Sequence, residues 1–337
     1  WKDIYEDGLV NGQSEYYIAR NQNEQEAIFH KDNPQEPISQ WWKTVKSYGV
    51  VEGKSEYYIV QNQNEQEAIF HIDNPYEPIS QWWNSIDSDG FVRGESEYYI
   101  AHYNTDKQAI FHIENPNQPI SQLWNNICTV GLIEGQSEYY IVQREDFQHA
   151  IFHKDNPDEP ITNWHKYIFP FGLINNTSEY YAVIDKEASA IKIYHPINLS
   201  QPLYELPNDE ENLLLYFNDK HAIYLADKHI VIYDSAKMIY EEISSLPKGL
   251  QKILQDIEEY NSSYRINIVA TNQLISQYIN DGFLPIVVQQ FMNNDHYYLF
   301  NTNGAYIGKF NNVKQMTQYI QQEISKKKLS CDMIRLY

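Results

Sequence analysis

The chain has few cysteines and no long apolar run. Cys128 and Cys331 are its two cysteines in 337 residues, which is too few for the disulfide framework of a small secreted domain. No run of about 18 apolar residues occurs, so nothing predicts a membrane-spanning helix. No signal peptide is visible after Trp1. The hydrophobic content of 42% is close to that of globular proteins, which argues against wholesale disorder.

Basic residues are also scarce. The 25 Lys and Arg residues stand against 46 Asp and Glu residues, which gives a formal net charge of −21. That balance disfavours phosphate backbones and anionic membranes as partners. It favours a basic protein partner, or it serves solubility alone. No serine has the Gly-x-Ser-x-Gly surroundings of a hydrolase nucleophile. We therefore predict no enzyme, no catalytic residues and no cofactor.

What the sequence has is a repeat of 41 residues. The tag Ser-Glu-Tyr-Tyr begins at five equally spaced serines: Ser14, Ser55, Ser96, Ser137 and Ser178. Glycines keep the same step, at Gly8, Gly49, Gly90, Gly131 and Gly172, and Ala-Ile-Phe-His recurs at 27–30, 68–71, 109–112 and 150–153. Repetition at a fixed period predicts a tandem array of small supersecondary units.

One repeat predicts two strands and a helix. Residues 15–20 and 25–30 are rich in β-branched and aromatic residues, with a polar hairpin tip between them. The serine of the tag is expected to set the turn into the first strand. Asp32-Asn33-Pro34 then looks like a helix start. The spacing of the apolar residues fits one helix face: Ile38, Trp41, Trp42 and Val45. Gly49 is expected to end that helix.

The predicted fold class is α+β, in two domains. Residues 1–205 form the tandem strand–strand–helix array, and residues 206–337 form a divergent α+β domain that caps it. In the second domain we expect hairpins at 222–233 and 297–310, strands near 266–270 and 284–290, and helices at 235–245, 250–260, 273–279 and 312–324. Trp1-Lys2 aligns with Trp42-Lys43, so we expect the chain to be a fragment with further repeats upstream, or else to start at a natural edge.

The tyrosine pairs give the candidate binding surface. Adjacent residues of a strand point to opposite faces, so one tyrosine of each pair is expected beneath the helix and the other on the opposite face. A glutamate precedes each pair, and the face would then be aromatic and acidic unless a second layer covers it. The predicted binding residues are Glu15, Tyr17, Glu56, Tyr58, Glu97, Tyr99, Glu138 and Tyr140.

Two further columns of residues have structural explanations. The histidines His30, His71, His112 and His153 lie one repeat apart, too far apart to share a metal ion. We expect each to bond the adjacent turn while the following acid or Asn caps the helix, and we predict no metal site. The tryptophans at 41–42 and their equivalents are expected to fill a core between repeats; the alternative is a stacking platform for sugars or peptides.

The preferred function is a non-enzymatic, protein-binding repeat protein. Its acidity and few cysteines favour an immunity or inhibitor protein that neutralises a basic partner such as a bacterial toxin, acting in the cytoplasm. The alternative is a secreted or surface-attached adhesin or glycan-binding protein, for which exposed aromatics in near-identical repeats are suited. The partner, whether an open stack or a closed ring forms, and the oligomeric state stay open at this point.

Overall fold

The computed structural model describes residues 2–5, 7–10, 12–46, 49–176, 178–184, 190–207, 213–217, 221–226, 229–234, 239–243, 264–268, 282–290, 296–301 and 306–334. Its contacts divide the chain into two compact units, Trp1–Pro170 and Phe171–Tyr337. The sequence placed a boundary near residue 205, whereas by contacts the hairpin of the fifth repeat belongs to the second unit.

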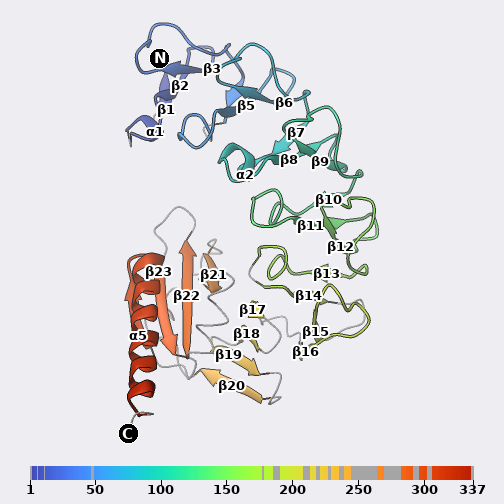
Figure 1. Cartoon of the computed structure of the whole chain (residues 1–337). Coiled ribbons are helices and arrows are strands. Elements are labelled where there is room, and N and C mark those ends of the chain that lie inside the picture. Colours follow the sequence, from blue (N-terminus) through green and yellow to red (C-terminus); the bar gives the residue numbers. More distant parts are fainter. Residues whose placement is uncertain are drawn as a thin grey trace. The chain divides into compact units, whose positions relative to one another are not determined.

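The first unit is a succession of small antiparallel sheets, one per repeat (Figure 1). Each sheet contains the predicted hairpin and a third strand that precedes it in the sequence. The sheets are β1 (Asp3–Tyr5), β2 (Tyr16–Arg20) and β3 (Glu26–His30); β4 (Thr44–Val45), β5 (Tyr57–Gln61) and β6 (Glu67–His71); β7 (Ser85–Asp87), β8 (Tyr98–His102) and β9 (Gln108–His112); and β10 (Asn126–Ile127), β11 (Tyr139–Gln143) and β12 (His149–His153). β13 (Tyr167–Ile168) is the last strand of the unit.

The predicted strand–strand–helix repeat is wrong, because the segment expected to be helical folds back on the hairpin. The amide of Ile38 donates to the carbonyl of Ile28 at 2.8 Å, and Trp42 exchanges two backbone hydrogen bonds with Glu26. Pro37 explains the failure. It has no N–H to give to a helix, and it disfavours the α conformation of the residue before it. Within the described residues of this unit, the helices are α1 (Asp7–Val10) and α2 (Asp89–Val92), of four residues each.

The same segment links two successive sheets. Trp42 bonds to β3 through its backbone, and Thr44 and Val45, two and three residues later, pair with β5 of the next sheet. The equivalent linking segments begin at Trp83, Trp124 and His165, whose backbones bond to Glu67, Gln108 and His149. The segments that begin at Trp42, Trp83 and Trp124 therefore each join one repeat to the next by main-chain hydrogen bonds.

The hydrophobic core lies between the sheets. Ile18 and Ile28 of the first repeat pack in one cluster with Tyr58 and Phe70 of the second, and the following pairs of repeats have equivalent clusters. Trp42 contributes to the same cluster, with its ring 5.3 Å from that of Phe70. The prediction that this tryptophan column packs between repeats is confirmed. Neighbouring repeats consequently cover both faces of the second and third hairpins.

Two glycines show how closely the repeats approach. Gly53 has a φ of +68°, and a Cβ there would lie 1.8 Å from the carbonyl oxygen of Gln13 in the preceding repeat. Gly135 meets the carbonyl of Glu95 in the same way. These glycines allow main chain to touch main chain between repeats. Gly49 also has a positive φ, of 79°, but it lies in a turn and ends no helix.

The second unit contains longer sheets. β14 (Tyr181–Ile184), β15 (Ala190–Tyr194) and β16 (Tyr204–Pro207) pair in order. One four-stranded sheet follows, of β17 (Leu213–Phe217), β18 (His221–Ala226), β19 (His229–Asp234) and β20 (Ile239–Ile243), and then another, of β21 (Tyr264–Ile268), β22 (Phe283–Gln290), β23 (His296–Asn301) and β24 (Tyr306–Phe310). Helix α5 (Val313–Ile334) follows β24.

The second unit confirms some of the elements predicted for it and contradicts others. Both predicted hairpins are confirmed, as β18–β19 and β23–β24. The helix expected at 312–324 is α5, which packs Met316 and Ile320 against Leu299 of β23. The helix expected at 235–245 is wrong, because 239–243 form strand β20. The helices expected at 250–260 and 273–279 lie outside the described residues. In the described part of the chain, no helix is long and apolar enough to cross a membrane.

Candidate functional site

The Ser-Glu-Tyr-Tyr tag of each repeat is held in place by its serine. The hydroxyl of Ser14 accepts the amide of Tyr16 at 3.0 Å and donates to the carbonyl of Val50 in the next repeat at 2.7 Å. Ser55 and Ser96 bond in the same way to Val92 and Leu132. The serine thus sets the turn into the strand, as predicted, and it also fixes the tag against the neighbouring repeat.

The four tyrosines predicted for the binding surface are not at the surface. Tyr17 is 7% exposed, and Tyr58, Tyr99 and Tyr140 are fully buried. The preceding repeat covers this face at Tyr58, Tyr99 and Tyr140, whereas Tyr17 packs with Leu9 and Trp41 of its own repeat. This covering is the second packed layer that would remove the site. Burial also raises the pKa of Tyr58, Tyr99 and Tyr140 well above its ordinary value. The choice of these tyrosines as contact residues is therefore corrected.

The first tyrosine of each pair is the one that reaches the surface. Tyr16, Tyr57, Tyr98 and Tyr139 are all half-buried. The ring of Tyr57 meets His71 edge-on, with centroids 5.1 Å apart, and each of the other three meets the histidine of its own repeat similarly. Sequence alternation separated the two tyrosines but could not tell which one a neighbouring sheet would cover.

The histidines connect the tag to the turn after the hairpin. Nδ1 of His71 accepts the amide of Asp73 at 3.2 Å, so the ring hydrogen lies on Nε2 and can be donated to Glu56 at 3.2 Å. The other three histidines have the same two partners in their own repeats. Bonding to the adjacent turn is as predicted, whereas the predicted helix caps are wrong because no helix follows. No group of three or more metal-ligating side chains occurs among the residues described.

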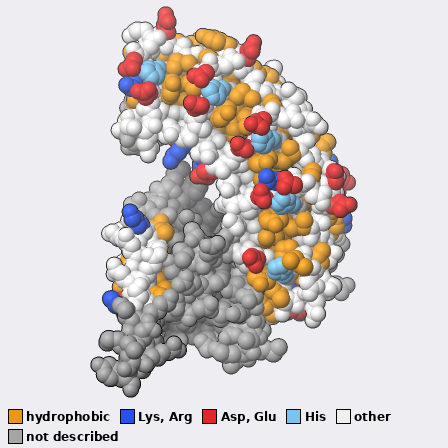
Figure 2. All heavy atoms as spheres, in the orientation of Figure 1, with side chains coloured by type: hydrophobic (Ala, Val, Ile, Leu, Met, Phe, Trp, Pro, Cys, Tyr) orange, Lys and Arg blue, Asp and Glu red, His pale blue; other side chains and the backbone are white. Residues whose placement is uncertain are grey.

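The predicted glutamates are exposed. The side chains of Glu15, Glu56, Glu97 and Glu138 are 60%, 75%, 73% and 61% exposed. Figure 2 shows a row of histidines, each beside acidic side chains and among hydrophobic ones. We call the tag glutamate, the first tyrosine and the histidine of each repeat, taken together, the acidic row. It combines negative charge with aromatic surface at every repeat.

The row differs between repeats at the residue after each histidine. Lys31 lies 3.2 Å from Glu15, and Lys154 lies 3.2 Å from Glu138. The lysine hydrogen bond lowers the pKa of each of these glutamates. The second and third repeats carry Ile72 and Ile113 at this position. Glu56 and Glu97 therefore lack the lysine that the first and fourth repeats supply.

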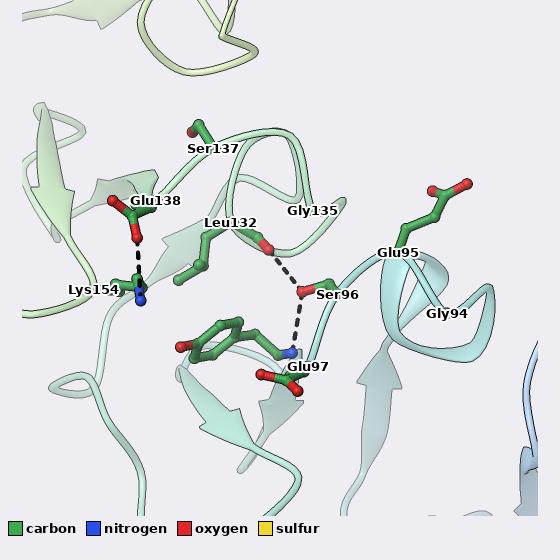
Figure 3. Close-up of a pocket in the computed structure, with 10 residues that line it drawn as sticks. Gly94, Glu95, Ser96, Glu97, Leu132, Gly135, Ser137, Glu138 and Lys154 are labelled. Atoms are coloured by element: carbon green, nitrogen blue, oxygen red, sulfur yellow. Dashed lines mark hydrogen bonds and ion pairs between the residues drawn. The ribbon is translucent and has the colours of Figure 1, made fainter.

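Grooves lie between successive tags. The first groove, with a volume of about 440 Å³, runs between the tags of the first two repeats and is lined by Glu15, Tyr16, Glu56, Ile72 and Asp73, among others. The second groove, of about 340 Å³, lies at the equivalent place between the third and fourth repeats. Figure 3 shows Glu138 of the second groove paired with Lys154, and Ser96 bonded to the Leu132 carbonyl. No sequence signal indicated these grooves, because each is formed by two repeats.

No protein-family model matches the chain, and no curated protein matches its sequence. Among solved structures it is similar to Kluyveromyces lactis Hsv2, with a TM-score of 0.40, 10% identity, and coverage of 89% of this chain and 96% of that one. It is also similar to the WD40 beta propeller domain of Doa1, with a TM-score of 0.37, 11% identity, and coverage of 77% and 80%. The N-terminal domain of Nup159 gives a TM-score of 0.32, 10% identity, and coverage of 62% and 57%.

These comparisons contradict the predicted immunity or toxin-inhibitor function, since the similar structures named include a WD40 β-propeller domain and no such inhibitor. They give no support to the alternative of an adhesin or glycan-binding protein. All of these likenesses are distant.

Proposed function

We propose that this chain is a non-enzymatic repeat protein that binds another protein, and that the partner surface is basic. The observation that carries the proposal is the acidic row. Four exposed glutamates recur at equivalent places, each beside a half-buried tyrosine that offers rigid, amphipathic contact area. A surface repeated at every unit suits an extended or bulky protein better than a small substrate.

Charge supports the choice of a basic partner. The chain carries a net charge of −21, and complementary charge steers association and excludes partners of the wrong sign. Exposed charges are screened by salt over about 8–10 Å at ordinary ionic strength. Binding through the acidic row should therefore weaken steeply as salt is added. A cytoplasmic site of action stays a prediction.

The test compares two sets of variants, each of which replaces four carboxylates by neutral amides. One changes Glu15, Glu56, Glu97 and Glu138 to Gln in the acidic row. The control changes the same number of exposed acids elsewhere: Glu36, Glu77 and Glu159 to Gln and Asp106 to Asn. Both sets alter the net charge equally, so bulk charge cannot distinguish them.

Proteins captured by each variant are identified by mass spectrometry at about 0.05 M and about 0.5 M NaCl. A protein with a basic surface should be captured by the unmodified chain and the control at low salt, and lost with the acidic-row variant or at high salt. Capture that resists salt, or that falls equally with both variants, would contradict the proposal.

A further inference from the structure

The first groove has the composition of a site for a cationic side chain. Tyr16 and Ile72 line it together with three acidic residues, Glu15, Glu56 and Asp73, and with Lys54. The pKa of Tyr16 is raised first by its partial burial and then by the charges of Glu15, Asp73 and Glu56. An aromatic ring and an aliphatic wall suit the methylene stem of a lysine, and the carboxylates suit its ammonium.

The second groove shows what fills such a space. There the chain supplies its own cation: Lys154 lines the groove with Glu97, Tyr98 and Glu138. Its ammonium lies 3.2 Å from Glu138. The pKa of Lys154 is raised first by its hydrogen bond to Glu138 and then by the charge of Tyr98. The tag glutamate and first tyrosine therefore already hold an ammonium group in one groove of this molecule.

The first groove has no lysine at the place of Lys154, because the equivalent residue is Ile72. Lys54 lines this groove at another point, and Lys31 is paired with Glu15. Glu56 bonds to His71, and Asp73 is 85% exposed and adds a carboxylate to the lining. Lys154 is thus replaced by an apolar wall, and an acidic side chain faces the space. A cation supplied from outside would restore the arrangement of the second groove.

We propose that the groove between the first two tags binds a lysine side chain of the partner protein, in the way that the second groove holds Lys154. This inference rests on the proposed function and names the contact that the partner would make. The lysine stem lies against Tyr16 and Ile72, and its ammonium lies beside Glu56, the equivalent of Glu138, and Asp73. An extended basic segment would present such a lysine across the acidic row.

The repeat itself supplies the test variants. The residue after each histidine is either lysine or isoleucine, as Lys31, Ile72, Ile113 and Lys154 show. Either residue should therefore be compatible with folding. Ile72→Lys should fill the first groove from within and block it. Lys154→Ile should open the second groove. The two changes are matched, and each serves as the folding control of the other through its far-ultraviolet circular dichroism and its urea midpoint.

The probe is acetyl-Gly-Lys-Gly-amide, titrated into the full chain and followed by amide chemical shifts. A single lysine side chain should bind with a dissociation constant on the order of 1 mM, shifting the amides of Tyr16, Glu56 and Asp73. Ile72→Lys should weaken binding at least tenfold, and Lys154→Ile should add shifts at Ser96 and Glu138. The norleucine peptide, which has no ammonium, should not bind.

Equal shifts with the norleucine peptide, or an unchanged dissociation constant for Ile72→Lys, would overturn the inference. The outcome is separable from that of the proposed function. If the basic partner is still captured by Ile72→Lys and the peptide does not bind, this groove assignment falls and the function stands. If capture resists salt while the lysine peptide binds in the groove, the proposed function falls and the groove assignment stands.

Discussion

At the scale of single residues, the first position of the second hairpin strand holds neighbouring repeats together in the first three repeats. Glu26, Glu67 and Gln108 are all buried there. A side-chain oxygen of each accepts the amide of the linking segment that follows, at Val45, Ile86 and Ile127, at 2.8 Å in every case. A buried amide needs such an acceptor, since leaving it unpaired costs about 1–3 kcal/mol. The position therefore tolerates Glu or Gln for the same physical reason.

Two substitutions of Glu67 distinguish its role as a hydrogen-bond acceptor from the effect of its charge on stability. Glu67→Gln keeps an oxygen for the Ile86 amide, as Gln108 does for Ile127, and loses only the ion pair with Lys46. Glu67→Ala leaves the amide unpaired. We expect Glu67→Ala to lower the free energy of unfolding by about 1–3 kcal/mol and Glu67→Gln to lower it by less than half as much, measured by urea denaturation. Equal losses would show that the ion pair, and not the amide bond, stabilises this link.

At the scale of the elements, the hairpins are local and the contacts between repeats are not. Each hairpin pairs residues within one repeat, such as Ile18 with Ile28. The linking segments, the tag serines and the close glycines all join neighbouring repeats. The loop that contains Gly53 is one of the tightest of these contacts, because its main chain lies against that of Gln13.

Two glycines with the same backbone conformation separate strain from contact. Gly12 and Gly53 both have a φ of +68°, but a Cβ on Gly12 meets nothing within 4 Å. Gly12→Ala should cost about 1–2 kcal/mol of stability, from the left-handed conformation alone. Gly53→Ala should cost several times more, because its Cβ would overlap the Gln13 carbonyl. Urea denaturation of both variants measures the difference in stability. Equal costs would show that the loop containing Gly53 can move away from Gln13 freely.

At the scale of the whole molecule, buried tyrosines make stability depend on alkaline pH. Burial raises the pKa of Tyr58, Tyr99 and Tyr140 above the ordinary value of 10.0. Above pH 10 the unfolded chain loses these protons while the folded chain keeps them, so deprotonation favours unfolding. Their contribution is complete below pH 10 and decreases as the pH rises beyond it.

The urea midpoint should therefore be nearly constant between about pH 8 and pH 9 and should fall at about pH 11. Tyr58→Phe keeps the ring but removes one ionisable group. In this variant, the free energy of unfolding should decrease less steeply with pH, by up to about 1.4 kcal/mol per pH unit, the value for one proton. Tyrosinate absorbance, recorded during the same titration, should show some tyrosines ionising only with unfolding. An identical pH dependence for Tyr58→Phe would contradict the assignment.

Part of the candidate site could be read from the sequence. Alternation along a strand required one tyrosine of each pair to differ in environment from the other, and the exposed glutamates were identified directly. The buried tyrosine was misassigned because the deciding contact, between Tyr58 and the first repeat, is not local. The grooves were missed for the same reason, since Tyr16 and Ile72 come from different repeats.

The helix was predicted from a pattern that has another cause. Ile38, Trp42 and Val45 are apolar because the segment contacts two successive sheets in turn. A strand segment that changes sheets can imitate helical spacing over so few residues, and Pro37 was the signal against it.

By itself the sequence determined the 41-residue repeat, its hairpin, the polar turn and the acidic surface, because these depend on neighbours in the chain and on residue type. Only the tertiary structure decided that the third strand comes from the linking segment, which tyrosine is covered, and where grooves form. Those features arise between repeats, where the main chain and side chains of two neighbouring repeats meet. The same residue types then occupy different surroundings.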